Sequence, residues 1–592
     1  MTDSASACPE PARREPVESV ERGASWRRDL LLLAVGFGLL YFFRLGSYPL
    51  SNPDEGRYAE IPREMLASGD WVTPRLNGVN YFEKPPLVYW LTAVVGKIFG
   101  MNEWSVRAVP VLFALWGVLL TYAAGRRLQD RTAGLAAAIV LGTSLLYFVI
   151  GHIPILDMAV SVLMSQALFC FILGVREPAG APRRWLFYQL YASLALATLA
   201  KGLIGFLVTG AVMFCWLLIF NQWHRLRPLH LPTGVLLFLG LAAPWHVLAA
   251  LRNETWAHRY FVYEHWERFM SPVASRPGAW HYFLWIVLAG LIPWTGFLWP
   301  AVRDAVSGGP FGRFDGLTAG GLKASWARRK ENADAWFFVT WAVFIFFFFS
   351  ISKSKLPPYV LPIFPALAWL IGAWLARVLA AQEVARLRVG LGVFSFLCGL
   401  LAVALGVVVT RPAVVKMDAA QALALQLPAL AMAAVLLLGG IFAPWLAKTR
   451  GVRAALAGMT ATIVVFFVAL QFAAPQIQKP GTKALARLVQ ARAQPGDRVL
   501  HYHEFFHDFI FYAARTVEIV AFKGELELEE DAAARASGRF MDEQAFRQAW
   551  AGPARLWVVA RQRDLKELFA DATFHYHLLG ETADHYLFSN QP

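Results

Sequence analysis

Residues 51–66, SNPDEGRYAEIPREML, follow a few positions after the first strongly apolar run of the chain, residues 30–43. Within eleven positions this stretch carries six ionisable side chains: Asp54, Glu55, Arg57, Glu60, Arg63 and Glu64. A chain that is otherwise apolar therefore places a dense group of charges at the mouth of its first candidate membrane segment. The side of the membrane that this stretch faces decides how the remaining segments are arranged.

The composition is that of a polytopic membrane protein. The 592 residues are 57% hydrophobic and only 16% charged, whereas a soluble protein carries roughly 25% charged residues. Apolar runs of about 20 residues, the length that crosses a hydrocarbon core, recur at close spacing. The net charge of +14 gathers in short loops between these runs, where basic residues set topology. Nucleic acid is therefore not an expected partner, whereas the lipid bilayer is.

Thirteen apolar runs are candidate membrane spans: residues 29–48, 105–125, 132–150, 156–175, 185–200, 203–221, 231–250, 281–302, 336–351, 358–379, 388–410, 426–446 and 453–473. Residues 86–99 form a further apolar run, but 14 residues are too few to span the bilayer. Counting it as a span would also move Arg126 and Arg127 to the other side. We therefore expect an amphipathic helix that lies at the membrane interface.

The basic loops predict the orientation. The side of the amino terminus receives Arg126, Arg127, Arg131, Arg176, Arg183, Arg184, Arg225, Arg227, the 303–334 loop and the basic residues of 377–388 and 448–453. By the positive-inside rule this side is cytoplasmic. Residues 1–28 lack a signal-peptide cleavage site and are expected to remain as a cytoplasmic tail. The segments that face the opposite side are then 49–104, 252–280, 352–357 and 475–592.

Three regions follow from this pattern: the tail 1–28, a membrane domain 29–474 whose first outer loop is 49–104, and a soluble domain 475–592. Short β-rich runs of the last region (498–503, 516–521 and 555–559) alternate with helical stretches (542–550 and 564–569). This alternation predicts a small α/β domain. The four cysteines, Cys8, Cys170, Cys215 and Cys398, all lie outside it, so no disulfide framework is expected there.

The first outer loop has the densest set of candidate functional residues. If residues 53–66 are helical, Asp54, Arg57 and Tyr58 share one face, although Pro62 predicts a kink or break partway. Further on, Glu83 and Lys84 precede two prolines that stiffen the backbone and begin the next helix. The plain alternative is a solvated loop whose charges rest among the lipid head groups.

Charged residues in three other stretches of the sequence weigh against that alternative. Lys201 interrupts an apolar run as an unpaired lysine at the end of a span, which is often functional, although snorkelling would also explain it. Lys353 and Lys355 lie between two spans on the side that topology does not favour, where they suit a lipid-borne phosphate or snorkel to the head groups. Asp157 opens a span near His152, where it could hold a nearby cation or simply favour the helix dipole.

Metal and nucleotide chemistry have weaker signals. Helical spacing would place His258 and His265 on one face near Glu83, so a divalent cation is conceivable, but this spacing is not diagnostic. A metal at His501, His503 and His507 is less expected than an ordinary strand-to-helix edge. The sequence contains no Gly-rich phosphate loop, no His-Glu-x-x-His motif and no nucleophile-elbow serine. A nucleotide-driven enzyme or pump is therefore poorly supported, and no cofactor is required.

The motifs NPDEGRYAEIPREML, YFEKPPLVYWL, LAKG and SKSKLPPYVLPIFPALA together resemble the lipid A 4-amino-4-deoxy-L-arabinose transferases. These belong to glycosyltransferase family 83, in the GT-C superfamily with the protein O-mannosyltransferases. The resemblance implies a mainly α, polytopic GT-C fold with amphipathic periplasmic helices. It also implies transfer of aminoarabinose from undecaprenyl phosphate to a lipid A phosphate, at the periplasmic face of a bacterial inner membrane, with resistance to polymyxin as the result.

The resemblance carries roles to matching positions. Asp54 matches the acidic position that is central to GT-C catalysis, and Lys84 and Lys201 become donor-phosphate contacts. Arg268 is a further candidate for the phosphate. Other side chains expected to bind substrate or line the same cavity are Glu55, Arg57, Tyr58, Glu83, Asp157, Lys353, Lys355 and Tyr359. No motif of the family can be placed beyond about residue 475.

Chemistry refines the role of Asp54. A phosphate monoester has a second pKa near about 6, so it is already a nucleophile at neutral pH, and Asp54 would orient the sugar and need not act as a base. One alternative is a GT-C enzyme that uses another polyprenyl-linked sugar, such as mannose for protein hydroxyls. A polyprenyl-lipid flippase is a second alternative. Transporters place charges near the bilayer midplane and show repeated halves, whereas the charges here gather at one face and no repeat is evident.

Overall fold

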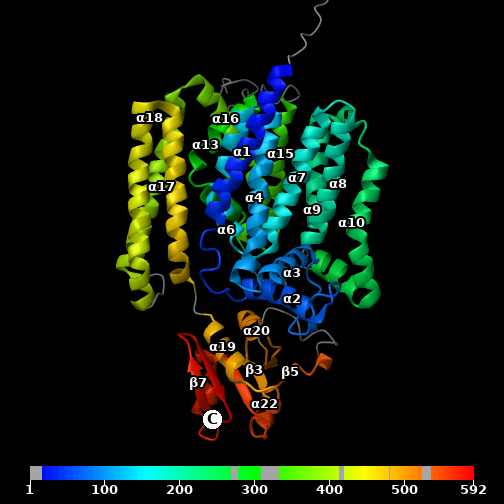
Figure 1. The fold of residues 1–592 in the computed structure, drawn as a ribbon, viewed down its shortest axis with the longest axis vertical. Coiled ribbons are helices and arrows are strands. Elements are labelled where there is room, and N and C mark those ends of the chain that lie inside the picture. The colour runs from blue at the N-terminus through cyan, green and yellow to red at the C-terminus, as the bar shows by residue number, and fades with distance from the viewer. Residues whose placement is uncertain (1–15, 268–277, 308–331, 413–418, 479–480, 523–534) are drawn as a thin grey trace, which may run out of the picture.

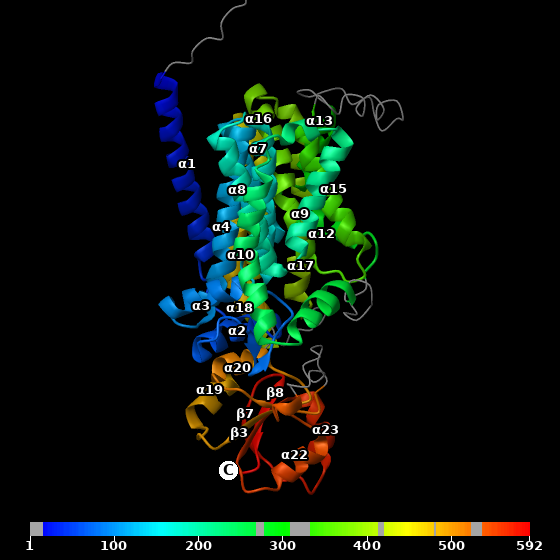
Figure 2. The same cartoon turned by 90° about the vertical axis from the view of Figure 1, so that its right-hand side faces the viewer.

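A computed structural model describes residues 16–267, 278–307, 332–412, 419–478, 481–522 and 535–592. A bundle of long helices stands above a layer of short elements from the first outer loop, and the soluble domain lies beyond that layer (Figures 1 and 2). This order places residues 49–104 between the membrane bundle and the carboxy-terminal domain. The charged stretch that opens the sequence therefore lies where the two parts meet.

The bundle follows the predicted spans closely. Its helices are α1 (Pro16–Phe42), α4 (Glu103–Leu128), α5 (Arg131–Gly142), α6 (Leu145–Gly151), α7 (Leu156–Arg176), α8 (Ala181–Lys201), α9 (Ile204–Phe220), α10 (Leu231–Arg252), α12 (Tyr282–Gly290), α13 (Thr295–Ser307), α15 (Ala333–Ile351), α16 (Phe364–Ala381), α17 (Val384–Thr410) and α18 (Ala419–Ile477). Short helical turns η1 (Trp223–Leu226), η2 (His258–Glu267) and η3 (Pro357–Ile363) connect some of them. Among the described residues, seven helices are long and apolar enough to cross a membrane, or nine if each bent pair is one span. Every predicted span falls on a helix, while the number thirteen stays a prediction.

Two spans that the sequence predicts as continuous are broken. The pair α5 and α6 bends by 63°, and the pair α12 and α13 bends by 103°. The two breaks satisfy each other: the Leu145 N–H donates to the Ile292 carbonyl at 3.1 Å, and Trp294 Nε1 donates to Thr143 Oγ1 at 2.9 Å. Backbone groups freed inside a membrane must find partners within the protein, so the breaks form as a pair. Hydropathy alone contains no sign of this pairing.

The expected loop between the last two spans is shorter than predicted. Both spans belong to α18, and the chain turns at Gly451, whose φ of 82° departs from helical values. Glycine adopts this conformation without steric cost. The turn at the end of the bundle therefore needs no extended loop.

The first outer loop forms α2 (Asp54–Ser68), the hairpin strands β1 (Arg75–Leu76) and β2 (Val79–Asn80), and α3 (Leu87–Phe99). The predicted break at Pro62 is wrong, because α2 continues through it. A proline removes one N–H donor, and the buried Ile61 and Met65 hold the helix against the layers on both sides. Helix α3 has 13 residues and exposes Ile98 and Phe99, which fits the interfacial helix that the sequence predicts.

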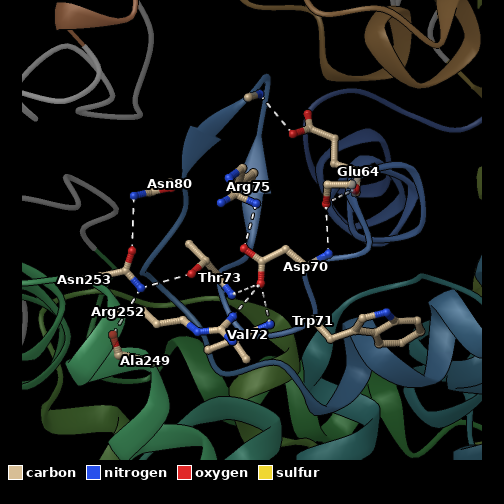
Figure 3. A network of polar contacts seen from close by, with 12 residues as sticks. Glu64, Asp70, Trp71, Val72, Thr73, Arg75, Asn80, Ala249, Arg252 and Asn253 are labelled. Carbon is tan, nitrogen blue, oxygen red and sulfur yellow. Dashed lines mark hydrogen bonds and ion pairs between the residues drawn. The ribbon is translucent and has the colours of Figure 1, made fainter.

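A polar network pins this loop to the end of α10 (Figure 3). Asp70 Oδ1 accepts from the N–H groups of Val72 and Thr73 at 3.0 and 3.2 Å, and its other oxygen pairs with Arg75 at 2.9 Å. Asn253, directly after α10, donates to Thr73 Oγ1 at 3.0 Å. These bonds satisfy the loop backbone and hold the hairpin at a fixed place between the bundle and the soluble domain.

The soluble domain is the α/β fold that the sequence predicts. Its six-stranded sheet has the order β5-β4-β3-β6-β8-β7, with β3 to β6 parallel and β8 antiparallel to both neighbours. The elements are α19 (Lys483–Arg492), β3 (Arg498–Tyr502), α20 (His507–Ala513), β4 (Glu518–Val520), β5 (Phe540–Met541), α22 (Glu543–Trp550), β6 (Leu556–Arg561), η6 (Gln562–Leu565), α23 (Lys566–Ala570), β7 (His577–Glu581) and β8 (His585–Ser589). Sequence reasoning missed β7 and β8. Strand β7 is an exposed edge strand, and its pairing with β8 is interrupted by an irregularity between Leu578 and Gly580.

Candidate active site

The site begins at the first turn of α2. Asp54 is the first residue of the helix, and its side chain is 53% exposed. One turn later, the Arg57 side chain is only 11% exposed, and its guanidinium lies 3.9 Å from the Asp54 carboxylate. A carboxylate at a helix amino terminus is favoured by the helix dipole. Asp54 is thus an accessible anion beside a nearly buried cation.

Arg57 has capacity for a further anion. Burial alone would lower the pKa of Arg57, but the pKa is raised because Tyr81, Tyr58, Glu83 and Asp54 favour the charged form. Its Nε is buried with no hydrogen-bond partner among the described residues. A buried donor without a partner is costly, so an acceptor oxygen from a ligand would be stabilised here.

Tyrosines form the wall around this cation. The ring of Tyr58 stacks on that of Tyr89, with centroids 6.0 Å apart. The Tyr81 hydroxyl donates to Glu83 Oε2 at 3.1 Å. Burial raises the pKa of Tyr58, so its hydroxyl keeps its proton. The wall therefore presents neutral groups that can donate hydrogen bonds without adding negative charge.

A second ion pair lies next to the first. Asp157, at the start of α7, binds the Lys201 ammonium at the end of α8, as the sequence suggested for Asp157. The prediction that Lys201 is unpaired is wrong. Lys201 Nζ also lies 5.1 Å from the ring centroid of Tyr359, in η3. Burial is the largest cause of the raised pKa of Tyr58, and the negative charges of Asp54, Glu83 and Asp157 raise it further. The two ion pairs therefore lie in one electrostatic environment.

The other expected site residues lie in different surroundings. Glu55 is buried and accepts two bonds of 2.9 Å from the fully buried Arg107, so it fastens α2 to α4. Lys355 is buried and donates to the carbonyls of Ser350 and Ser352 at 2.9 and 2.5 Å, which satisfies the carboxyl end of α15. In the structure both side chains therefore stabilise the protein framework.

Glu83 belongs to the group around Arg57, because it accepts a bond from Tyr81 and its charge raises the pKa of Arg57 and Tyr58. Glu83 and Lys84 lie between β2 and α3, and Lys353 lies after α15. His258 begins η2, whereas the side chain of His265 and the whole of Arg268 lie outside the described residues. Within the described part of the chain, no three His, Cys, Asp or Glu side chains gather as a group that could hold a metal ion.

Sequence reasoning also missed residues that support the site. One of them is Arg107, which lies inside a predicted span. A charged residue inside a span is often functional, so the sequence does contain a sign of its importance. From the soluble domain, the His507 N–H donates to Asn52 Oδ1 at 2.9 Å, two residues before Asp54. Burial and then Arg57 hold the pKa of His507 well below its ordinary value. No local pattern could reveal this contact, because 455 residues separate the two partners.

A helical membrane bundle, a charged site at one end and an α/β domain beyond it define a membrane protein of the GT-C type. The family model described as dolichyl-phosphate-mannose-protein mannosyltransferase matches residues 83–247. The undecaprenyl phosphate-alpha-4-amino-4-deoxy-L-arabinose arabinosyl transferase of Edwardsiella ictaluri is 33% identical over 62% of this chain and 63% of its own length. The Erwinia tasmaniensis protein of the same name is 30% identical over 67% of this chain and 69% of its own.

The crystal structure of ArnT from Cupriavidus metallidurans bound to undecaprenyl phosphate is similar throughout, with a TM-score of 0.82. It is 28% identical and covers 95% of this chain and 97% of that one. The chain therefore belongs to the family of undecaprenyl phosphate-alpha-4-amino-4-deoxy-L-arabinose arabinosyl transferases. The alignment with the Edwardsiella protein spans just under two thirds of that relative's length.

Proposed function

We propose that this protein transfers 4-amino-4-deoxy-L-arabinose from undecaprenyl phosphate to a phosphate of lipid A, on the side of the membrane that the soluble domain faces. The observation that carries the proposal is the group of Asp54, Arg57, Asp157 and Lys201, at the level where membrane helices meet soluble domain. The chain resembles ArnT bound to undecaprenyl phosphate over nearly its whole length. The proposed location is the bacterial inner membrane, with the amino terminus cytoplasmic and the site periplasmic, and the expected phenotype is polymyxin resistance.

Two cations serve the departing phosphate. When the sugar leaves, negative charge grows on the polyprenyl phosphate, and preorganised cations in a partly buried site stabilise that charge. Arg57 has an unpartnered Nε, and Lys201 is held in place by Asp157 on one side and the Tyr359 ring on the other. Both are oriented before the reaction, so little reorganisation is needed. Lys84, Lys353 and Glu83 are proposed to line the same cavity.

Asp54 is proposed to act on the sugar. The acceptor phosphate is nucleophilic at neutral pH, so it requires no general base. The exposed carboxylate of Asp54 can bind the sugar amine and stabilise positive charge that develops at the anomeric carbon. Direct attack by the phosphate from the opposite face breaks the bond to the donor phosphate in the same step and inverts the anomeric centre.

The test replaces Asp54 with Asn in a strain that lacks its own enzyme. Lipid A is then analysed by mass spectrometry for the mass gain of aminoarabinose. We expect Asp54→Asn to lose the modified species, and Asp542→Asn to retain it, because Asp542 only caps α22 in the soluble domain and asparagine caps as well. A well-expressed Asp54→Asn protein with full activity would exclude the proposed role of this carboxylate.

The family model that matches residues 83–247 is described by a mannose donor. A mannose lipid is therefore the alternative substrate. Purified protein can be offered the aminoarabinose lipid and the mannose lipid in parallel. Transfer from the first lipid alone supports the proposal. Transfer from the mannose lipid alone would replace aminoarabinose with mannose and leave the role of the ion pairs unchanged.

A further inference from the structure

One end of the helix bundle lies away from the soluble domain (Figure 1). A polar pocket of about 420 Å³ opens among residues at this end. It is formed where α4 and α7 end, where η1 follows α9, and where α15 begins. Its polar lining consists of Gln129, Arg176, Gln222, Arg225, Asn332 and Asp334. Phe338 and Trp369 form an apolar wall and stack with their ring centroids 3.9 Å apart. The proposed reaction uses none of these residues.

The pocket carries one positive charge in excess. Arg225 donates to Asp334 Oδ1 at 2.7 Å, and Arg176 Nε lies 3.4 Å from Asp334 Oδ2. Arg176 also donates to the Leu128 carbonyl at 3.0 Å. A guanidinium has five N–H donors, so the contacts with described residues leave several donors available on each arginine. Two cations therefore converge on a single carboxylate.

Further donors in the pocket are without an acceptor. Asn332 Nδ2 and Trp369 Nε1 are buried, and neither has a hydrogen-bond partner in the described part of the chain. The Trp369 residue is only 8% exposed. Helix α15 begins after Asn332 with no side-chain cap, and the first N–H groups of a helix need an external acceptor. The uncapped helix end and the two residues with unpartnered donors, Asn332 and Trp369, thus border the same cavity.

We propose that this pocket binds the phosphate of an anionic phospholipid, in the leaflet opposite the soluble domain. A phosphate supplies the acceptor oxygens that the helix end, Asn332 and Trp369 lack, and it suits paired arginines. The pocket lies at the ends of membrane helices, where head groups gather, and basic pockets between such helices bind anionic lipids. The inference is independent of the proposed reaction.

Native mass spectrometry of the detergent-purified protein tests the proposal with three probes: phosphatidylglycerol, phosphatidylcholine and inorganic phosphate. We expect retention of one phosphatidylglycerol, with about fivefold weaker retention of the zwitterionic lipid, the ratio that one extra cation at a membrane surface provides. Retention of inorganic phosphate in place of the anionic lipid would overturn the proposal that the bound phosphate belongs to a lipid. Equal retention of both lipids would overturn the charge argument.

The decisive variant is Asn332→Asp. It removes an amide donor and adds a negative charge that repels phosphate, while aspartate at a helix amino terminus stabilises the helix. Trp369→Phe keeps the ring and removes only the Nε1 donor. Arg127→Gln is the matched control, since Arg127 is an exposed cation near the same end of α4 and outside the pocket. We expect both pocket variants, with unchanged melting temperature, to lose the lipid and the control to keep it. Equal retention by the variants and the control would overturn the proposal.

Discussion

Three carboxylates of one helix have different surroundings. Asp54 is half exposed, Glu55 is bound to Arg107, and Glu60 is completely buried and accepts two bonds of 2.6 Å from Arg63. The sequence shows only that acids are dense here. Which of them faces a ligand depends on the orientation of α2 against its neighbours, so the role of each residue follows from its exposure and partners.

Lys201 is the first residue-scale test. We expect Lys201→Met to lower the initial rate of transfer at least about 100-fold, because removing one preorganised donor to a developing charge costs about that much. Lys201→Arg, which keeps the cation for Asp157, should retain part of the rate. Lys566→Met in the soluble domain is the control. A Lys201→Met rate within twofold of the wild type would remove Lys201 from the proposed mechanism.

Glu60 makes stability depend on pH. Burial raises the pKa of Glu60 to about 8, although Arg63 opposes the shift. Between its ordinary pKa and about 8, the folded protein keeps a proton that the unfolded chain releases, so stability should fall as pH rises through this window. Below the window both states are protonated, so Glu60 no longer makes stability depend on pH. We expect Glu60→Gln to flatten the melting temperature between pH 5 and 8. An unchanged slope would contradict the raised pKa of the buried Glu60.

At the scale of elements, α2 is held from two sides. Arg107 of α4 donates to both oxygens of Glu55 and to the carbonyls of Leu45, Tyr48 and Pro49, which fixes the amino end of α2 to the bundle. On the other side, α20 of the soluble domain packs so closely that a methyl group on Gly56 would lie 2.4 Å from the Asp508 nitrogen. The helix that carries Asp54 is thus clamped between membrane and soluble parts.

Gly56→Ala tests this clamp. The clash is with backbone and cannot be relieved by a side-chain rotation, so we expect a loss of about 1–3 kcal/mol, as for other overpacked positions. Activity should fall with it, since Asp54 would shift. Gly392→Ala is the matched control, because nothing lies within 4 Å of the added carbon. Thermal unfolding and the lipid A assay measure both effects. Equal behaviour of the two variants would contradict close packing at Gly56.

Hydrophobic periodicity predicts most of the elements, and its failures have physical causes. The local pattern of apolar residues predicts the spans and the strands at 498–502 and 556–561. The bend between α5 and α6 depends on a bond from Leu145 to Ile292, which no window of local sequence contains. The sequence suggests that Asp157 binds a nearby cation. That this cation is Lys201 depends on how α7 packs on α8. The sequence thus predicts which residues could form the site more readily than it predicts how they are arranged in space.

At the scale of the molecule, the soluble domain is joined to the first outer loop at separate points. Tyr512 accepts a bond of 2.8 Å from the Leu50 N–H and donates to Glu103 at 2.9 Å. Asn77, in the hairpin turn, accepts from the Val517 N–H at 2.7 Å and donates to the Val517 carbonyl at 2.9 Å. These contacts flank α2, so the soluble domain supports the helix that carries the proposed site.

The double variant Asn77→Gly with Tyr512→Phe tests this support. Asn77 has a φ of 58°, so glycine keeps the turn while the two amide bonds are lost. The variant removes four hydrogen bonds, at about 1 kcal/mol each. We therefore expect the α2 amides to exchange hydrogen at least about tenfold faster and the transfer rate to fall. Arg547→Gln, in α22 away from the bundle, is the control (Figure 1). Unchanged exchange in α2 of the double variant would show that the membrane bundle alone orders the helix that carries Asp54.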